Sequence, residues 1–192
     1  MDIAGLDRAW GDLWQGSPPV ARLLRGRFPE RHVRFHTLPG GTRYASSPAE
    51  GAEILRRHHE ILGELVGPER SNERLVAVTC SWSATSEVTP RDIGVAAIMP
   101  EATHWRSDDR ATEPGFHSWQ HHFASEVRLG SPALDELLEC VANDGTDEVT
   151  LTDSSCAWVY HPYDGGIDLF TRSTGVRDRL MIAYAEWLPG AV

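Results

Sequence analysis

The chain has 192 residues and a mass of 21.3 kDa, with 41% hydrophobic and 24% charged residues. This length suits one domain, and a chain of this mass buries about 70% of its surface on folding, enough for a core without metal or disulfide support. The composition excludes collagen, a coiled coil, a disulfide-dense scaffold and a wholly disordered chain.

Charge is distributed unevenly along the sequence. The 28 acids and 18 bases give a net charge of −10, and every base is Arg. Residues 1–74 hold ten acids and eleven Arg, whereas residues 75–192 hold eighteen acids and seven Arg. Nine acids and no base lie between Arg128 and Arg172. Such a field repels nucleic acid and attracts a basic partner.

The cysteines and the N-terminal sequence predict a cytoplasmic protein. Cys80, Cys140 and Cys156 are odd in number and form no C-x-x-C pair, which disfavours a zinc or redox motif. The first residues have neither the basic nor the apolar region of a signal peptide. The longest apolar run, 95–99, is too short to span a membrane. We therefore expect a soluble protein with reduced thiols and no membrane contact.

The first third of the chain predicts mainly helices. Apolar positions at helical spacing predict a helix over residues 3–14, and a second, short helix ends near Phe28-Pro29. Residues 32–38 alternate as a strand. Ser47-Pro48-Ala49-Glu50 has the spacing of a capping box and opens a long helix that ends at Gly67-Pro68.

The middle of the chain predicts strands around one long loop. Residues 75–82 and 94–99 indicate two strands, the second buried on both faces. Residues 100–115 show no periodicity, and a loop of that length is unusual in a compact domain unless it is mobile or functional. The alternation over 119–129 is typical of a long strand with one face in water.

The last third alternates between helix and strand signals. One helix opens at Ser131-Pro132 and a final helix is capped by Thr174. Asp164-Gly165-Gly166 supplies the positive φ of a tight hairpin turn. Three strands are predicted at residues 149–152, 156–160 and 167–170.

These elements together indicate the α+β class. Strands outnumber helices and most connections between strands are hairpins, so we expect a mainly antiparallel sheet of about five or six strands packed by three to five helices. The prediction is one domain over residues 1–192, with an N-terminal helical segment of about 1–30 and a sheet-containing body of about 31–192.

The most informative cluster for chemistry lies around the predicted hairpin. His161, Tyr163, Asp164 and Asp168 place two carboxylates beside an imidazole, a combination that performs acid–base catalysis when one face gathers it. The same residues also suit a purely structural role, in which Asp164 makes an Asx-turn and Asp168 follows the turn. Because the sequence contains neither a G-x-S-x-G elbow nor a P-loop, both interpretations stay open.

The nine histidines offer no clear metal site. His117 and His121 share a face of the predicted strand, but the rise per residue puts them about 14 Å apart, too far for one metal ion. On a helix the same spacing would fit two ligands, yet the H-E-x-x-H pattern is absent. We expect no metal and no cofactor.

The residues from Tyr163 to Asp168, followed by a helix ending in Trp187-Leu188, support a resemblance. They resemble the C-terminal signature Tyr-Asp-(Gly/Asp)-(Gly/Arg)-x-Asp of a family of uncharacterised bacterial proteins, known only as a domain of unknown function. The resemblance covers about residues 30–188 and implies a single cytoplasmic α+β domain without implying an activity. Some members have Asp-Arg-Gly at the turn, where Gly165-Gly166 here removes a potential catalytic acid and base.

Two functions of different classes follow from the sequence. The first is an acidic protein-binding module, like immunity or antitoxin proteins, that engages a basic partner; a plain soluble acidic surface is the alternative explanation of the same charges. The second is a small hydrolase or transferase that uses the cluster near residues 160–168, with the 100–115 loop as a lid. The predicted partner-binding acids are Asp135, Glu136, Glu139, Asp144, Asp147 and Glu148.

Overall fold

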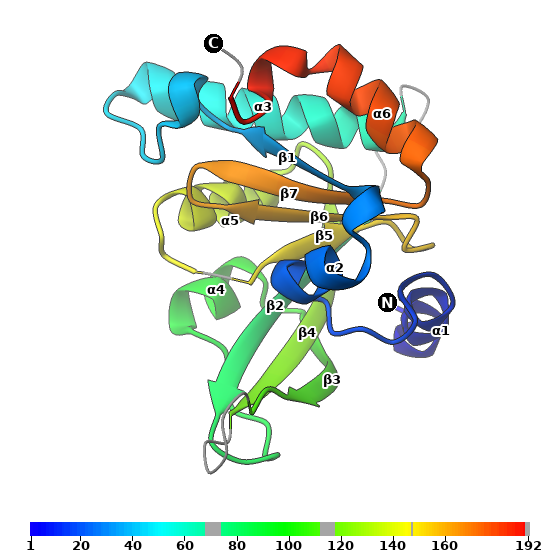
Figure 1. Cartoon of the computed structure of the whole chain (residues 1–192). Helices are drawn as coiled ribbons and strands as arrows, with labels where there is room; N and C mark the ends of the chain where they lie inside the picture. Colours follow the sequence, from blue (N-terminus) through cyan, green and yellow to red (C-terminus); the bar gives the residue numbers. More distant parts are fainter. Residues whose placement is uncertain (68–73, 112–117, 147, 191–192) are drawn as a thin grey trace.

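An open antiparallel sheet organises the protein (Figure 1). The computed structural model describes residues 1–67, 74–111, 118–146 and 148–190, and within them it has seven strands and six α-helices. The strands are β1 (His32–His36), β2 (Arg74–Ser83), β3 (Thr103–Asp109), β4 (Trp119–Arg128), β5 (Thr150–Thr152), β6 (Trp158–Tyr163) and β7 (Gly166–Thr171). They lie in the order β1-β7-β6-β5-β2-β4-β3. The helices are α1 (Ile3–Trp14), α2 (Ala21–Arg27), α3 (Pro48–Val66), α4 (Ile93–Ile98), α5 (Pro132–Ala142) and α6 (Thr174–Ala183).

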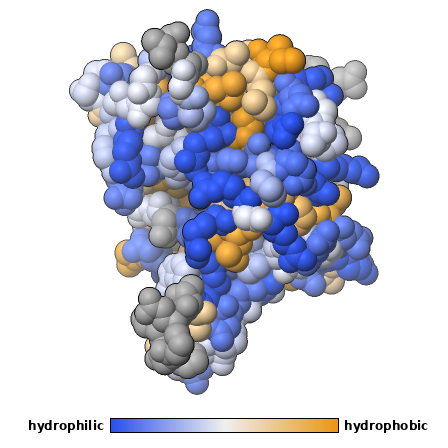
Figure 2. Space-filling view, viewed as in Figure 1, coloured by the Kyte–Doolittle hydropathy of each residue, from blue (hydrophilic) through white to orange (hydrophobic). Residues whose placement is uncertain are grey.

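Helices cover both faces of the sheet, so the fold has three layers. Alternate residues of β7 point to opposite faces: Ile167 and Leu169 pack in the larger core with α3, α5 and α6. Phe170 packs in a second core with Trp10 and Trp14 of α1, and with α2. In Figure 1, α1 and α2 lie on one side of the strands, with α3 and α6 together above them. The same face in Figure 2 is mostly hydrophilic, with hydrophobic side chains in several separate areas.

The two best helix predictions are confirmed, including their caps. Ser47 Oγ accepts a hydrogen bond from the Glu50 amide at 3.3 Å, while the Glu50 carboxylate accepts one from the Ser46 amide at 2.6 Å. Ser131 Oγ likewise accepts a bond from the Leu134 amide, at the start of α5. These bonds satisfy amide groups that a helix leaves unpaired in its first turn.

The α+β class is confirmed, but the sheet has seven strands where five or six were predicted, and the helices number six in the described chain where at most five were predicted. Of the residues 94–99, predicted as a strand, 94–98 belong to helix α4 and Met99 is its C-cap. Asp92 caps the start of this helix by accepting a hydrogen bond from the Gly94 amide at 2.8 Å. A short apolar run fits a strand or a buried helix equally well, and here the Asp92 cap favours the helix.

The predicted loop over 100–115 is also wrong at residues 103–109, which form edge strand β3 and pair with β4. A bulge between His104 and Arg106 shifts the register, and the exposed edge carries charged residues, so the usual alternation is lost. Residues 112–115 lie outside the described residues.

The water-exposed face predicted for β4 is present only at its end, where Glu126 and Arg128 are exposed, and the prediction is wrong for the rest of the strand. Ala124 packs in the core formed by α1 and α2, and Gln120 and His122 on the same face have no exposed surface. The N-terminal segment supplies this cover, which the pattern of β4 alone does not reveal. Helix α6 differs in one detail, because its N-cap residue is Ser173 and Thr174 is its first residue.

Candidate functional site

The hairpin between β6 and β7 has the predicted glycine turn. Gly165 has a φ of +103°, a conformation that side chains with a Cβ rarely adopt. Gly166 is needed for a different reason: a Cβ there would lie 2.6 Å from the Phe35 carbonyl oxygen and would also overlap the Tyr163 hydroxyl. Both glycines therefore allow the turn to pack closely against β1.

Asp168 is the centre of a buried ion-pair cluster on the face covered by α2. Its side chain is only 4% exposed. The Arg34 guanidinium donates two hydrogen bonds to it, from Nε at 2.8 Å and Nη2 at 2.7 Å. His32 Nε2 lies 2.7 Å from the same carboxylate, and Arg25 Nη1 lies at 3.4 Å. Asp168 thus joins α2, β1 and β7.

This environment fixes Asp168 as an anion. Burial alone would raise its pKa, but the hydrogen bonds from His32 and Arg34 outweigh burial and hold the pKa well below its usual value. A carboxylate held in this way does not donate a proton near neutral pH. The Tyr163 ring lies 4.9 Å from the Arg34 guanidinium carbon, and burial raises the pKa of its hydroxyl.

The other two members of the predicted catalytic cluster, His161 and Asp164, differ in their relation to Asp168. His161 is the register partner of Asp168 across β6 and β7, so both side chains lie on the same face. Asp164, at the turn, binds Arg43 and accepts a hydrogen bond from the Tyr44 hydroxyl at 2.9 Å. The two carboxylates therefore serve separate ion pairs, which favours the structural interpretation of this cluster over the catalytic one.

The six predicted partner-binding acids fall into three groups. Glu136, Glu139 and Asp144 are exposed. Asp135 is half-buried and lies 2.7 Å from His59 Nε2 of α3, and Glu148 is also half-buried. Asp147 lies outside the described residues. The outward orientation predicted for α5 is correct for Glu136 and Glu139, because its leucines turn towards the core.

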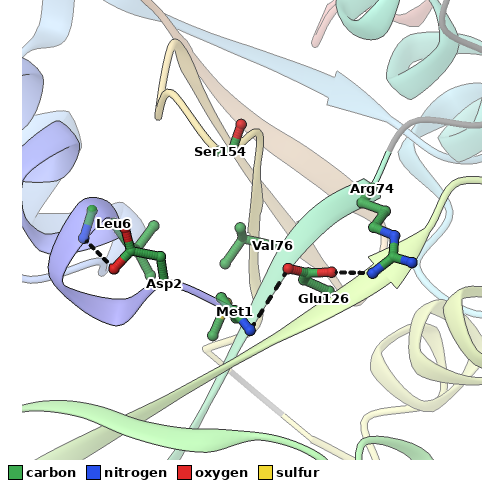
Figure 3. Close-up of a pocket in the computed structure, with 8 residues that line it drawn as sticks. Met1, Asp2, Leu6, Arg74, Val76, Glu126 and Ser154 are labelled. Carbon is green, nitrogen blue, oxygen red and sulfur yellow. Dashed lines mark hydrogen bonds and ion pairs between the residues drawn. The ribbon is translucent and has the colours of Figure 1, made fainter.

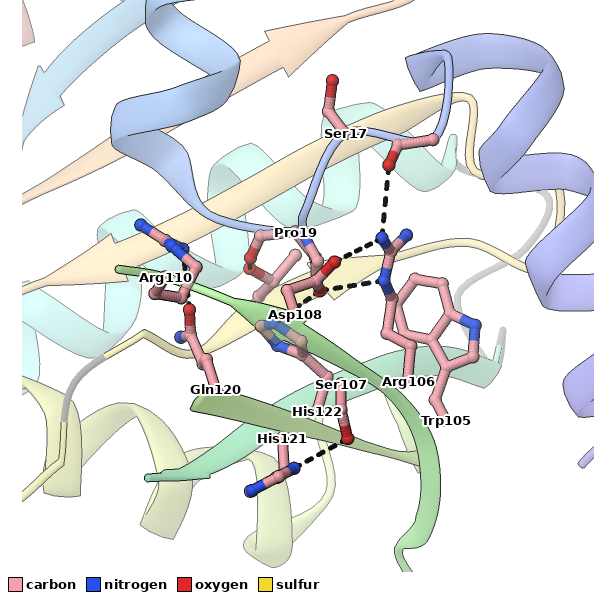
Figure 4. Close-up of polar contacts among 12 residues, drawn as sticks. Ser17, Pro19, Trp105, Arg106, Ser107, Asp108, Arg110, Gln120, His121 and His122 are labelled. Carbon is pink, nitrogen blue, oxygen red and sulfur yellow. Dashed lines mark hydrogen bonds and ion pairs between the residues drawn. The ribbon is translucent and has the colours of Figure 1, made fainter. Parts of the chain in front are cut away.

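A polar chain on β2, β3 and β4 was not predicted, and Figure 4 shows its contact between Ser107 and His121. The Ser107 hydroxyl lies 2.7 Å from His121 Nδ1 and 2.9 Å from His104 Nε2. His121 Nε2 lies 2.8 Å from the Ser83 hydroxyl. Burial, followed by the charge of His104, lowers the pKa of His121, which keeps its imidazole neutral.

A second polar group occupies the opposite face of the same strands (Figure 4). Arg106 donates two hydrogen bonds to Asp108, at 2.9 and 2.6 Å, and His122 Nε2 lies 3.3 Å from that carboxylate. Burial lowers the pKa of His122 despite Asp108, so the imidazole is neutral. Arg110 donates a 2.8 Å hydrogen bond to Gln120 Oε1. The sequence places His121 and His122 on opposite faces of one strand, but their partners Ser107 and Asp108 lie in the segment that was predicted as a loop.

A cavity of about 410 Å³ opens between α1 and the ends of β2 and β4 (Figure 3). Its charged groups bind within the chain: Arg74 Nη1 lies 2.5 Å from Glu126, and the Met1 amine lies 3.8 Å from the same carboxylate. Asp2 caps α1 by accepting a bond from the Gly5 amide at 2.9 Å. This cavity therefore has little charge left for a ligand.

The described residues offer neither a metal site nor a membrane-spanning helix. No group of three His, Cys, Asp or Glu side chains in the described parts of the chain is arranged to hold a metal ion. His117, one of the two histidines considered for such a site, lies outside those parts. None of the described helices combines the length and the apolar character needed to cross a membrane.

Comparison with known proteins gives one family. The model of a domain of unknown function, DUF3885, matches residues 20–191, which is most of the chain and agrees with the expected relation to an uncharacterised family. Helix α1 precedes the matched region. Neither the curated proteins nor the solved structures include a match.

Proposed function

The chain belongs to the DUF3885 family, which carries no assigned activity, and we propose from its own surface that it is a cytoplasmic protein-binding module for a basic partner. The proposed contact is the acidic α4–α5 surface, defined here as Asp92, Ile93, Glu136, Glu139 and Asp144. In this role the protein acts as immunity and antitoxin proteins do, by covering a positively charged face of another protein.

The observation that carries the proposal is an exposed apolar side chain at the start of α4, the helix that contacts the acidic helix α5. Ile93 is 87% exposed, the most exposed of the large hydrophobic residues in the described chain. It begins α4, which contacts α5. An isolated exposed apolar residue is ordinary on a surface, but one within a charged surface has the form of an interface anchor with a polar rim.

Sequence spacing places Glu136 on the same side of α5 as Cys140. Glu136, Cys140 and Asp144 follow each other at intervals of four, so Glu136 and Cys140 lie along one side of α5 and Asp144 lies just past its end. Asp92 caps α4, which contacts α5, and burial followed by the charge of Asp92 raises the pKa of the Cys140 thiol.

The acids of this surface are also available for a partner. Among the described residues, no Arg or His forms an ion pair with Glu136, Glu139 or Asp144, whereas Asp164 and Asp168 are paired with arginines. Exposed carboxylates of one sign steer an oppositely charged protein towards the surface, and this acceleration is screened beyond about 8 Å at physiological ionic strength.

The test compares two triple variants with the same change in net charge. The first replaces Glu136, Glu139 and Asp144 with Arg, and the matched control replaces the exposed acids Asp12, Glu87 and Glu186 with Arg. Each variant and the wild type capture partners from the native host, and the association rate of any captured protein is measured over a salt series.

We expect a basic protein to bind the wild type and the control but not the first variant. Its association with the wild type should slow steeply as salt is added. Replacing Ile93 with Ser should speed its dissociation, because the apolar anchor is lost. Equal binding by both triple variants, or failure of the wild type to retain any basic protein, contradicts the proposal.

A further inference from the structure

A second cavity, of about 260 Å³, lies between the last turn of α3, the start of β6, the end of β7 and the first turns of α6. It is larger than the cavity of about 150 Å³ that holds a benzene molecule in an engineered protein core. It lies away from the acidic α4–α5 surface, since neither α4 nor α5 lines it. A ligand in this cavity would therefore bind at a different place from the proposed partner.

The floor of this cavity is a continuation of the larger core. Trp158 and Leu180 are 5% and 3% exposed and belong to that core. Leu65 and Val176 are partly buried against it and form part of the wall. An apolar group entering here would be covered by an indole and by branched aliphatic side chains, which suits an aromatic or aliphatic side chain of about six or seven carbons.

Three charged side chains line the same cavity, and none of them forms an ion pair within the described chain. Arg172 and Arg179 are exposed and form no ion pair with a described residue, although Arg179 Nη1 lies 3.4 Å from the Gly175 carbonyl oxygen. Glu64 is exposed and likewise forms no ion pair with any residue in the described ranges. By contrast, Glu60 and Arg56, earlier on the same helix, bind each other.

The two signs of charge come from different sides of the cavity. Glu64 lies in the last turn of α3, where the helix carbonyl groups add negative potential. Arg172 immediately precedes α6 and Arg179 follows in its second turn, so the positive side is at the beginning of that helix. An apolar floor between a positive and a negative wall is complementary to a zwitterion with an apolar substituent.

We propose that this cavity binds a free α-amino acid with an apolar side chain. Its carboxylate is bound by Arg172 and Arg179, its ammonium group by Glu64, and its side chain packs against Trp158 and Leu180. A simple organic anion would meet the unfavourable charge of Glu64, and an uncharged apolar compound would leave all three charged side chains unused.

The first experiment titrates the full chain with L-phenylalanine and L-leucine by calorimetry. Two further ligands remove one charge each: N-acetyl-L-phenylalanine lacks the ammonium group and L-phenylalaninamide lacks the carboxylate. We expect saturable binding of the free amino acids, and at least about tenfold weaker binding of both derivatives. No binding of the free amino acids up to about 10 mM, or equal binding of either derivative, overturns the proposal.

The second experiment locates the site, first by substituting exposed residues whose replacement should leave the fold intact. Arg179→Ala and Glu64→Gln should each weaken L-phenylalanine binding about tenfold. Their matched controls, Arg22→Ala and Glu186→Gln, alter exposed residues that do not line the cavity and should leave binding unchanged. Val176→Phe, which fills the cavity, should abolish binding while circular dichroism still reports a folded protein. Binding that survives Val176→Phe or falls equally in the controls overturns the assignment.

Discussion

Arg34 and Asp168 are register partners on β1 and β7, and their side chains form an ion pair with two hydrogen bonds on the face covered by α2. Asp168→Ala should therefore destabilise the fold by about 3 kcal/mol, at the lower end of the range for a broken buried pair because Arg34 stays partly exposed. Urea unfolding measures this change. Asp178→Ala is the control, since its pair with Arg177 is on the surface, and it should cost less than about 1 kcal/mol. Similar losses in both variants would contradict a structural role for Asp168.

Protonation of His58 should destabilise the protein in mild acid. Its Nδ1 lies 2.5 Å from the Tyr160 hydroxyl in the core, and burial lowers its pKa from 6.5 to about 3. The unfolded chain thus binds a proton below about pH 6.5 that the folded chain does not bind, and stability falls as pH decreases from 6.5 towards 3. We expect a loss of about 2 kcal/mol between pH 7 and pH 5 from this group.

The measurement is the free energy of unfolding at several pH values for the wild type and for His58→Gln. Glutamine can still bond to Tyr160 but does not titrate, so the pH dependence should become shallower. His104→Gln changes an exposed histidine and is the control. An unchanged slope in His58→Gln would contradict the prediction.

The glycine turn gives a third prediction. Gly165→Val should destabilise the fold by more than about 1 kcal/mol, because a β-branched residue is strained at a φ of +103° and its Cβ would lie 3.0 Å from the Arg43 Cα. Gly175→Ala in α6 is the opposite case: nothing lies within 4 Å of the added Cβ, and Ala favours a helix. Thermal unfolding should show a lower Tm for the first variant and an equal or higher Tm for the second.

Helix α1 provides a fourth prediction, because it covers the face of the sheet that the sequence assigned to water. Trp14 is fully buried, and its indole Nε1 donates a 2.9 Å hydrogen bond to the Cys156 carbonyl oxygen. Trp14→Ala should cost about 3–5 kcal/mol in chemical unfolding. Trp82→Ala removes an indole that is 44% exposed and should cost much less. Equal costs would mean that α1 is not an integral layer of the fold.

Local signals in the sequence were enough to predict most elements of this fold. Helices α3 and α5 combine a serine cap, a proline in the first turn and a regular apolar stripe, and the structure confirms them. Strand β3 and helix α4 were missed because an edge strand tolerates charges and a six-residue helix has no visible period.

The candidate sites were only partly predictable. The outward acids of α5 follow from its own sequence, and the Gly165 turn follows from neighbouring residues. The role of Asp168 does not, since Arg34 and His32 are 134 and 136 residues away along the chain. The charges around the 260 Å³ cavity are likewise brought together from α3, from α6 and from the residue that follows β7, and no local pattern relates α3 to the other two.

The contact of α1 with the C-terminal part of the chain also constrains the order in which the protein assembles. Trp14 and its acceptor Cys156 are separated by 142 residues, so the first helices finish their packing only after nearly the whole chain has been synthesised. Contacts between such distant segments slow folding, to a timescale of about milliseconds to seconds. In pulse-labelled hydrogen exchange, the amides of α1 should therefore gain protection together with those of β6 and β7, and later than the amides within α3.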